Sequence, residues 1–148
     1  MPAIAALTIN DGQATPVAHT FGPHRIDEKQ VVTWFDRVSG VGIGFNKLTF
    51  SLRSPVGGPT AGLSSDAKKR VYKAVLTIDV PKLESTSAAT GTGIAPAPTV
   101  AYVHACRIEL SLPERGALAD RKDLIAYIKN SLSNASINTA LETLENFY

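Results

Sequence analysis

The sequence lacks several features that would place it in common protein classes. A single cysteine, Cys106, excludes an intramolecular disulfide framework and a multi-cysteine zinc site. No apolar run reaches the roughly 18 residues of a membrane-spanning helix, so no membrane partner is expected. The segment Met1 to Thr8 is apolar but lacks the basic residues that begin a signal peptide. These absences predict one soluble intracellular domain, residues 1–148.

Charge and catalytic motifs are equally scarce. Lys and Arg total 15 against 13 Asp and Glu, a net charge of +2 that excludes a histone-like polycation but leaves room for a local basic patch. The three histidines are scattered, and no H-E-x-x-H, G-x-S-x-G or C-x-x-C motif is present. His104 and Cys106 lie on the apolar side of a predicted strand, which favours a structural histidine and an unreactive core thiol. The sequence therefore predicts no enzyme and no cofactor.

What the sequence does contain is a series of strand patterns. The apolar run Ile4 to Ile9 precedes an Asp-Gly pair, which favours a tight turn before a returning strand over Ala14 to Phe21. The next segment, from Gly22 to Lys29, is predicted to break the pattern. Alternating and β-branched residues then predict four further strands, over Val31–Val38, Lys47–Arg53, Val71–Val80 and Val100–Leu112.

After Pro113 the apolar spacing changes from two residues to about 3.6, which indicates two amphipathic helices. Asp120 is expected near the start of the first helix, and Ser136 is expected to cap the second. The predicted fold is α+β. It has an N-terminal β-hairpin at about residues 3–21, an antiparallel β-sheet meander at about 31–112 and two C-terminal α-helices at about 117–146. The pattern leaves open whether the helices cover their own sheet or a partner's.

The polar side of the predicted strands gathers cations and hydroxyl groups. Its members by alternation are Lys47, Thr49, Ser51, Arg53, Lys73, Thr77 and Arg107, with Asp79 and Glu109 as opposing charges. Positive side chains beside hydroxyls suit the phosphate and ribose of single-stranded RNA. An ordinary solvated sheet face is the alternative interpretation.

The order and spacing of several short segments carry a family resemblance. The segments are the Asn10-Asp11-Gly12 turn, Val31-Val32-Thr33-Trp34, the strand Lys47 to Arg53, Val80-Pro81-Lys82-Leu83, the loop up to Pro98, Glu109 to Pro113 before two helices, and the terminal Tyr148. Together, and over nearly the whole chain, they resemble the coat proteins of small single-stranded RNA bacteriophages, the levivirus family.

The resemblance implies an intertwined homodimer with a continuous sheet, in which the helices of each subunit pack across the partner's sheet. It implies that dimers assemble in the cytoplasm of a bacterial host into a T=3 icosahedral shell, the virion capsid, around genomic RNA. The hairpin is expected on the outer surface, and the loop Ser85 to Pro98 at the symmetry axes. The connection Pro55 to Lys68 is longer than in well-studied relatives and has no functional interpretation.

The resemblance also implies that the inward sheet face binds an RNA hairpin, for packaging and for translational repression. The implied RNA-binding residues are Lys47, Thr49, Ser51, Arg53, Lys73, Val75, Thr77, Arg107 and Glu109. Two positions depart from the family, since Ala105 replaces a tyrosine that stacks on a base and Thr77 replaces a lysine. The preferred hairpin therefore does not carry over. The alternatives are a dimeric RNA-binding repressor that does not assemble, and a small-molecule enzyme with a ligand beside His104 and Cys106.

Overall fold

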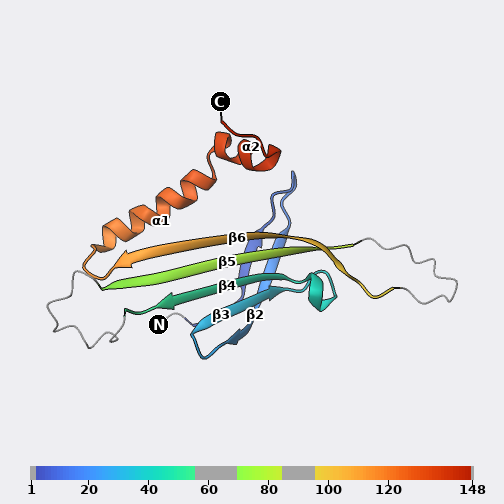
Figure 1. Cartoon of the computed structure of the whole chain (residues 1–148), viewed down its shortest axis with the longest axis horizontal. Helices are drawn as coiled ribbons and strands as arrows, with labels where there is room; N and C mark the ends of the chain where they lie inside the picture. Colours follow the sequence, from blue (N-terminus) through green and yellow to red (C-terminus); the bar gives the residue numbers. More distant parts are fainter. Residues whose placement is uncertain (1–2, 56–69, 85–95, 148) are drawn as a thin grey trace.

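The computed structural model describes residues 3–55, 70–84 and 96–147, which form one antiparallel sheet and two helices (Figure 1). The predicted connections Pro55 to Lys68 and Ser85 to Pro98 lie mostly outside these residues, as does Tyr148. The elements in order are β1 (Leu7–Asn10), β2 (Ala18–Ile26), β3 (Val31–Asp36), the 3-10 helix η1 (Gly42–Gly44), β4 (Asn46–Arg53), β5 (Val71–Leu83), β6 (Val100–Pro113), α1 (Leu118–Leu132) and α2 (Ala135–Thr143). Strands adjacent in sequence are adjacent in the sheet, which confirms the α+β meander.

The N-terminal hairpin is wider than the predicted tight turn. β1 pairs with β2 as far as Asn10 opposite Ala18, so residues 11–17 form the loop and the returning strand begins later than predicted. The side chain of Asp11 closes this loop, because its Oδ1 accepts a hydrogen bond from the amide of Val17 at 2.8 Å. An aspartate that bonds to nearby backbone amides can organise a loop without a two-residue turn.

Two strands run further than predicted. β2 continues to Ile26 through the expected break, because a register shift between Pro23 and Arg25 lets it keep pairing with β3. β5 continues past Pro81 to Leu83. Pro81 lies beyond the last residue pair with β4 and pairs only with β6, so β5 has one neighbouring strand here, a position where proline is tolerated.

The core lies on one side of the sheet, over β2, β3 and β4. Its buried members are Phe21, Trp34 and Leu48, and partly buried aliphatic side chains surround them. The indole Nε1 of Trp34 donates to the carbonyl oxygen of Ala5 at 2.8 Å, which holds the N-terminal segment against this cluster. We call this side of the sheet the apolar face; it continues across β5 and β6 through residues such as Ile78 and Ile108.

The helices leave the β5–β6 part of the apolar face uncovered. α1 runs away from the end of β6 and α2 lies beyond it, so neither packs along the sheet (Figure 1). Neither helix has a buried residue within the described chain. Cys106, predicted to be a small core residue, is exposed, as is His104. That prediction was wrong for the single chain because none of the elements between residues 3 and 147 that the structure describes covers this part of the sheet.

Local contacts fix the start of each helix. Asp120 lies in the first turn of α1, where its Oδ2 accepts from the amide of Ala117 at 3.3 Å. The N-cap of α2 is Asn134 rather than Ser136, and its side chain accepts from the Ser136 amide at 3.0 Å. These side chains satisfy amides that the helix itself leaves without partners.

Candidate functional site

The side of the sheet opposite the core brings the predicted RNA-binding residues together. Strand register aligns them in cross-strand rows, each of which runs from β3 or β4 to β6. The rows are Phe35–Lys47–Asp79–Ala105, Thr33–Thr49–Thr77–Arg107, Val31–Ser51–Val75–Glu109 and Arg53–Lys73–Ser111. We call this surface the polar face. Side chains directly opposite each other on paired strands lie about 5 Å apart, so each row is a continuous line of contact.

A shallow hollow of about 280 Å³ lies in the middle of the polar face. Its lining residues are Val31, Thr49, Ser51, Arg53, Lys73, Val75, Thr77, Arg107 and Glu109. Ser51 is buried, and the hydroxyls of Thr49 and Thr77 are hydrogen-bonded to each other. Of the predicted residues, Lys47 alone is outside the lining and lies in the neighbouring row.

Val31 is the lining residue that the sequence interpretation missed. Alternation along its strand already placed it on the polar side together with Thr33. Its apolar side chain gave no chemical reason to select it, and the register that sets it opposite Ser51 comes from the sheet. An aliphatic side chain at this position gives the hollow an apolar wall, against which the flat surface of a base can pack.

Charge on the polar face is unevenly balanced. Lys47 Nζ forms an ion pair with Asp79 Oδ2 at 3.0 Å, and Arg107 Nη2 lies 3.4 Å from Glu109 Oε2. Arg53 and Lys73 lie opposite each other across β4 and β5, and neither has an ion-pair partner within the described chain. Like charges directly opposite on a sheet repel. An anion at the Arg53–Lys73 end of the hollow would offset this repulsion, so we expect anion binding to be most favourable there.

This arrangement can bind a polyanion but offers little for catalysis. Two unpaired cations beside a row of hydroxyl groups can contact phosphate oxygens and ribose. No group of histidine, cysteine, aspartate or glutamate side chains in the described ranges is arranged to hold a metal ion. None of the helices found among those residues has the length and apolarity to cross a bilayer.

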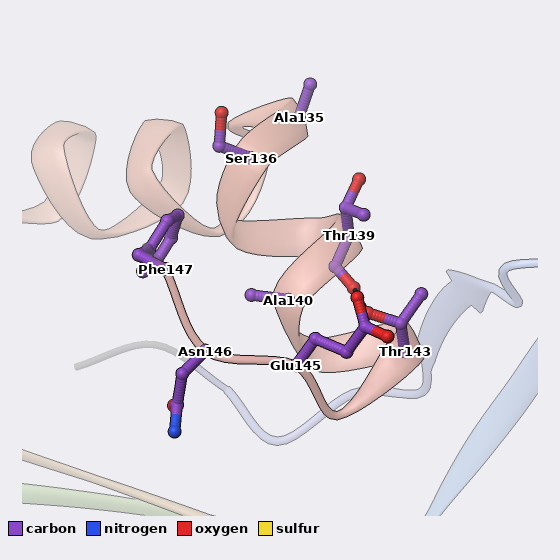
Figure 2. Close-up of a pocket in the computed structure, with 8 residues that line it drawn as sticks. All are labelled: Ala135, Ser136, Thr139, Ala140, Thr143, Glu145, Asn146 and Phe147. Carbon is purple, nitrogen blue, oxygen red and sulfur yellow. Dashed lines mark hydrogen bonds between the residues drawn. The ribbon is translucent and has the colours of Figure 1, made fainter.

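The helices carry a second unfilled surface, which is apolar. Leu144 is 90% exposed and Phe147 is 70% exposed, both unusually high for large apolar side chains. A groove of about 440 Å³ lies between α2 and the C-terminal tail. Its lining includes Ala140 and Phe147 together with polar residues such as Thr139 (Figure 2). An adjoining hollow of about 410 Å³ is lined by residues that include Ile137 and Leu141. Contiguous apolar surface of this kind marks a protein interaction site.

Comparisons with known proteins agree on one family. A sequence model of the levivirus coat protein family matches residues 2–148. The virus-like particle of bacteriophage ESE058 is 33% identical, with a TM-score of 0.85 over 99% of this chain and 100% of its own. The virus-like particle of bacteriophage NT-214 is 26% identical, with a TM-score of 0.80 over the same shares. The capsid protein of bacteriophage GA shares the fold at 18% identity, with a TM-score of 0.68 over 97% of each chain. No curated protein sequence matches.

Proposed function

The chain belongs to the levivirus coat protein family, and from that premise we propose that it builds its shell from intertwined homodimers whose polar face binds single-stranded RNA. The family assignment makes it a structural, shell-forming protein of the virion and not an enzyme. Its similarity to virus-like particles favours a protein that assembles over a repressor that stays free.

The uncovered apolar surfaces support the intertwined dimer. Among the described residues, one chain presents the β5–β6 part of its apolar face without a cover and two helices that pack on no sheet. Packing the α1 stripe of a second copy onto the β5–β6 part of the apolar face buries both surfaces at once. Burial contributes roughly 25 cal/mol for each Å² of apolar surface removed from water. A symmetric exchange of helices doubles this gain in each dimer.

The outer edge of β6 supports a continuous sheet. Within the described residues, β6 pairs with β5 on one side and no strand occupies its other side. The strand runs from Val100 to Pro113, so its edge presents a long row of unpaired backbone donors and acceptors. An edge of this length invites pairing with another chain. Pairing with the same edge of a second copy would join the two sheets and place both polar faces on one surface.

The observation that carries the RNA proposal is the unpaired charge of Arg53 and Lys73 beside the Thr49–Thr77 hydroxyl pair. The two cations suit consecutive phosphates, and the hydroxyls and the Val31 wall suit ribose and base. In the assembled shell many copies of this face would line the interior. Weak net charge for each chain then becomes a basic lining around the genome.

Two residues of the polar face differ from those at the same positions in well-studied relatives, and both differences affect contacts with RNA. Ala105, at the position where well-studied relatives have a stacking tyrosine, removes an aromatic platform next to Asp79. Thr77 bonds to Thr49 instead of supplying a lysine charge. We propose that the polar face retains RNA packaging and repression of translation through an RNA hairpin, with a hairpin preference that differs from that of those relatives.

Expression of the chain alone in bacteria tests the proposal. We expect it to sediment as large particles that contain nuclease-protected RNA, and electron microscopy should show a T=3 icosahedral shell. Particles of normal size that contain no RNA would contradict the proposed RNA binding and support the proposed shell. A dimer that stays discrete at every concentration would contradict assembly from this chain and restore the free repressor.

A further inference from the structure

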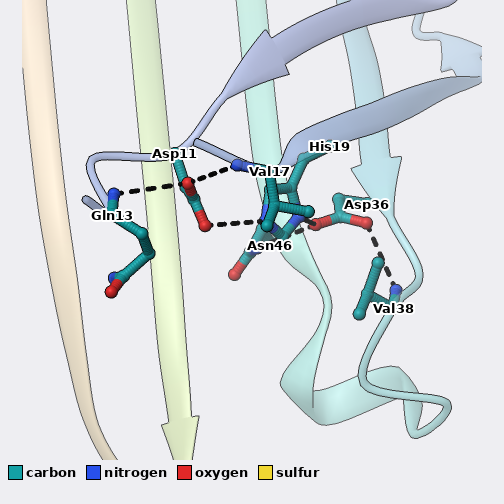
Figure 3. Close-up of polar contacts among 7 residues, drawn as sticks. All are labelled: Asp11, Gln13, Val17, His19, Asp36, Val38 and Asn46. Atoms are coloured by element: carbon teal, nitrogen blue, oxygen red, sulfur yellow. Dashed lines mark hydrogen bonds and ion pairs between the residues drawn. The ribbon is translucent and has the colours of Figure 1, made fainter. Parts of the chain in front are cut away.

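His19 of β2 lies between two carboxylates that belong to different parts of the fold (Figure 3). Its Nδ1 is 2.7 Å from Oδ2 of Asp36, the last residue of β3. Its Nε2 is 3.6 Å from Oδ2 of Asp11, which closes the β1–β2 hairpin loop. The imidazole therefore spans the gap between the hairpin loop and the main sheet.

The Asp36 side of this bridge is firmly held. Asp36 is 2% exposed, and its Oδ2 also accepts from the side-chain amide of Asn46 at 3.0 Å. Its Oδ1 accepts from the amide of Val38 at 3.2 Å. The Asp11 side is looser, because Asp11 lies in an exposed loop and its contact with His19 is an ion pair longer than a hydrogen bond.

The charged groups that face His19 are these two carboxylates. β1 contributes no titratable side chain, and the loop after it contributes Asp11. β3 contributes Asp36, and β4 contributes the neutral amide of Asn46 to the same network. Of the cations on neighbouring elements, Arg37 has its Nη1 beside Gly22, and Lys47 is paired with Asp79 on the polar face. No cation in the described residues competes with His19 for either carboxylate.

We propose that His19 is a pH-operated clamp, which holds the β1–β2 hairpin loop, through Asp11, onto the His19–Asp36 pair when protonated and releases that loop when neutral. A neutral imidazole carries one N–H, whereas an imidazolium carries two. Only the charged ring can donate toward Asp11 and Asp36 at the same time. On deprotonation the short bond to the buried Asp36 keeps its proton, and the ring nitrogen that faces Asp11 presents a lone pair to a carboxylate.

The two carboxylates determine how the stability of the clamp changes with pH. The hydrogen bond to Asp36, followed by the charges of Asp36 and Asp11, raises the pKa of His19 above its ordinary value of 6.5 despite partial desolvation. A raised pKa in the folded state stabilises the protonated clamp, fully below about pH 6.5 and progressively less as the pH rises through the raised value. The amide of Val17 holds the pKa of Asp11 below its ordinary 3.8, so the Asp11 side persists until strongly acidic pH.

Hydrogen exchange of the hairpin in purified particles tests the clamp. Peptides that cover residues 11–18 are compared at about pH 6 and pH 8.5, after correction for the intrinsic chemical rate of exchange. We expect the loop amides of the wild-type protein to lose about two- to fivefold protection at the higher pH, the range for an exposed ion pair. In His19→Gln the amide can still donate to Asp36 but does not titrate, so the pH dependence should disappear.

A matched control and a second variant keep the test decisive. His24 is exposed on the same strand and packs against Phe35 with ring centroids 5.0 Å apart, so His24→Gln should retain the full pH dependence. Asp11→Asn removes only the loop side of the bridge and should also abolish it, which covers the case in which His19→Gln does not assemble. A wild-type hairpin with equal protection at both pH values would overturn the clamp. Undiminished pH dependence in Asp11→Asn would overturn it as well.

Discussion

Replacing Ile128 with aspartate is expected to abolish both dimers and shells. Ile128 lies on the apolar stripe of α1 beside Ile125 and Leu132, which are 43% and 48% exposed in the single chain. In the proposed intertwined dimer this stripe would pack on the partner's sheet. Loss of a buried isoleucine costs about 2–5 kcal/mol, and an unpaired carboxylate at the same place adds a desolvation cost. At about 3 kcal/mol or more for each subunit, the dimer dissociation constant rises by about four powers of ten.

Analytical ultracentrifugation and electron microscopy measure this effect, with Ala126→Asp as the control. Ala126 lies on the opposite side of α1 among polar residues such as Lys122 and Asn130, so the same added charge should leave particle yield unchanged. Ala126→Asp loses slightly more helix propensity than Ile128→Asp, because alanine is the best helix former, so propensity does not explain a defect confined to Ile128→Asp. Normal particles from Ile128→Asp would mean that α1 does not bury its stripe between subunits.

The double variant Arg53→Ala, Lys73→Ala is expected to lose most of its RNA binding while still forming dimers. Each phosphate contact on a single strand contributes about 0.7 to the slope of log affinity against log salt concentration, so the slope should fall by about 1.4 for each occupied face. If Arg53 contacts a base instead, Arg53→Ala alone should cost about 1–3 kcal/mol and relax sequence preference. Titration of dimers with fluorescent single-stranded RNAs of mixed and of defined sequence across a salt series distinguishes the two cases.

The control removes the same two charges elsewhere. Lys122 and Lys129 belong to α1 and not to a strand, so Lys122→Ala, Lys129→Ala changes the net charge equally without touching the polar face. This control should retain the wild-type slope and the wild-type content of protected RNA. Equal losses in the two double variants would show that overall charge, rather than the Arg53–Lys73 end of the hollow, holds the RNA.

Strict alternation of apolar and polar residues predicted the strands and their faces correctly. The predicted bounds were less accurate where a side-chain hydrogen bond or a neighbouring strand decides where an element begins or ends. Leu48, Phe50 and Leu52 against Thr49 and Ser51 place β4 and its two faces correctly. The hairpin was predicted too tight because the Asp-Gly pair was interpreted as a turn, whereas Asp11 bonds to Val17 across a wider loop. The continuation of β5 past Pro81 depends on where β4 ends, which no property of β5 itself reveals.

The candidate site was predicted in outline for the same reason. Parity along a single strand already assigns Thr49, Arg53 and Lys73 to the polar side, because side chains of a strand point alternately to its two faces. The pairing of Arg53 with Lys73, the neutralisation of Lys47 by Asp79 and the inclusion of Val31 in the hollow depend on register. Register is a relation between strands and is invisible in the spacing of any one of them.

The sequence by itself determined the order of strands and helices, the two faces of the sheet and the family resemblance, since all three are written in local periodicity and in the order of short motifs. Only the tertiary structure decided that α1 and α2 leave their own sheet, that Cys106 is exposed in a single chain and that His19 joins Asp11 to Asp36. These features depend on distances between residues far apart in the chain. Such distances are set by packing and strand register, which a one-dimensional pattern does not contain.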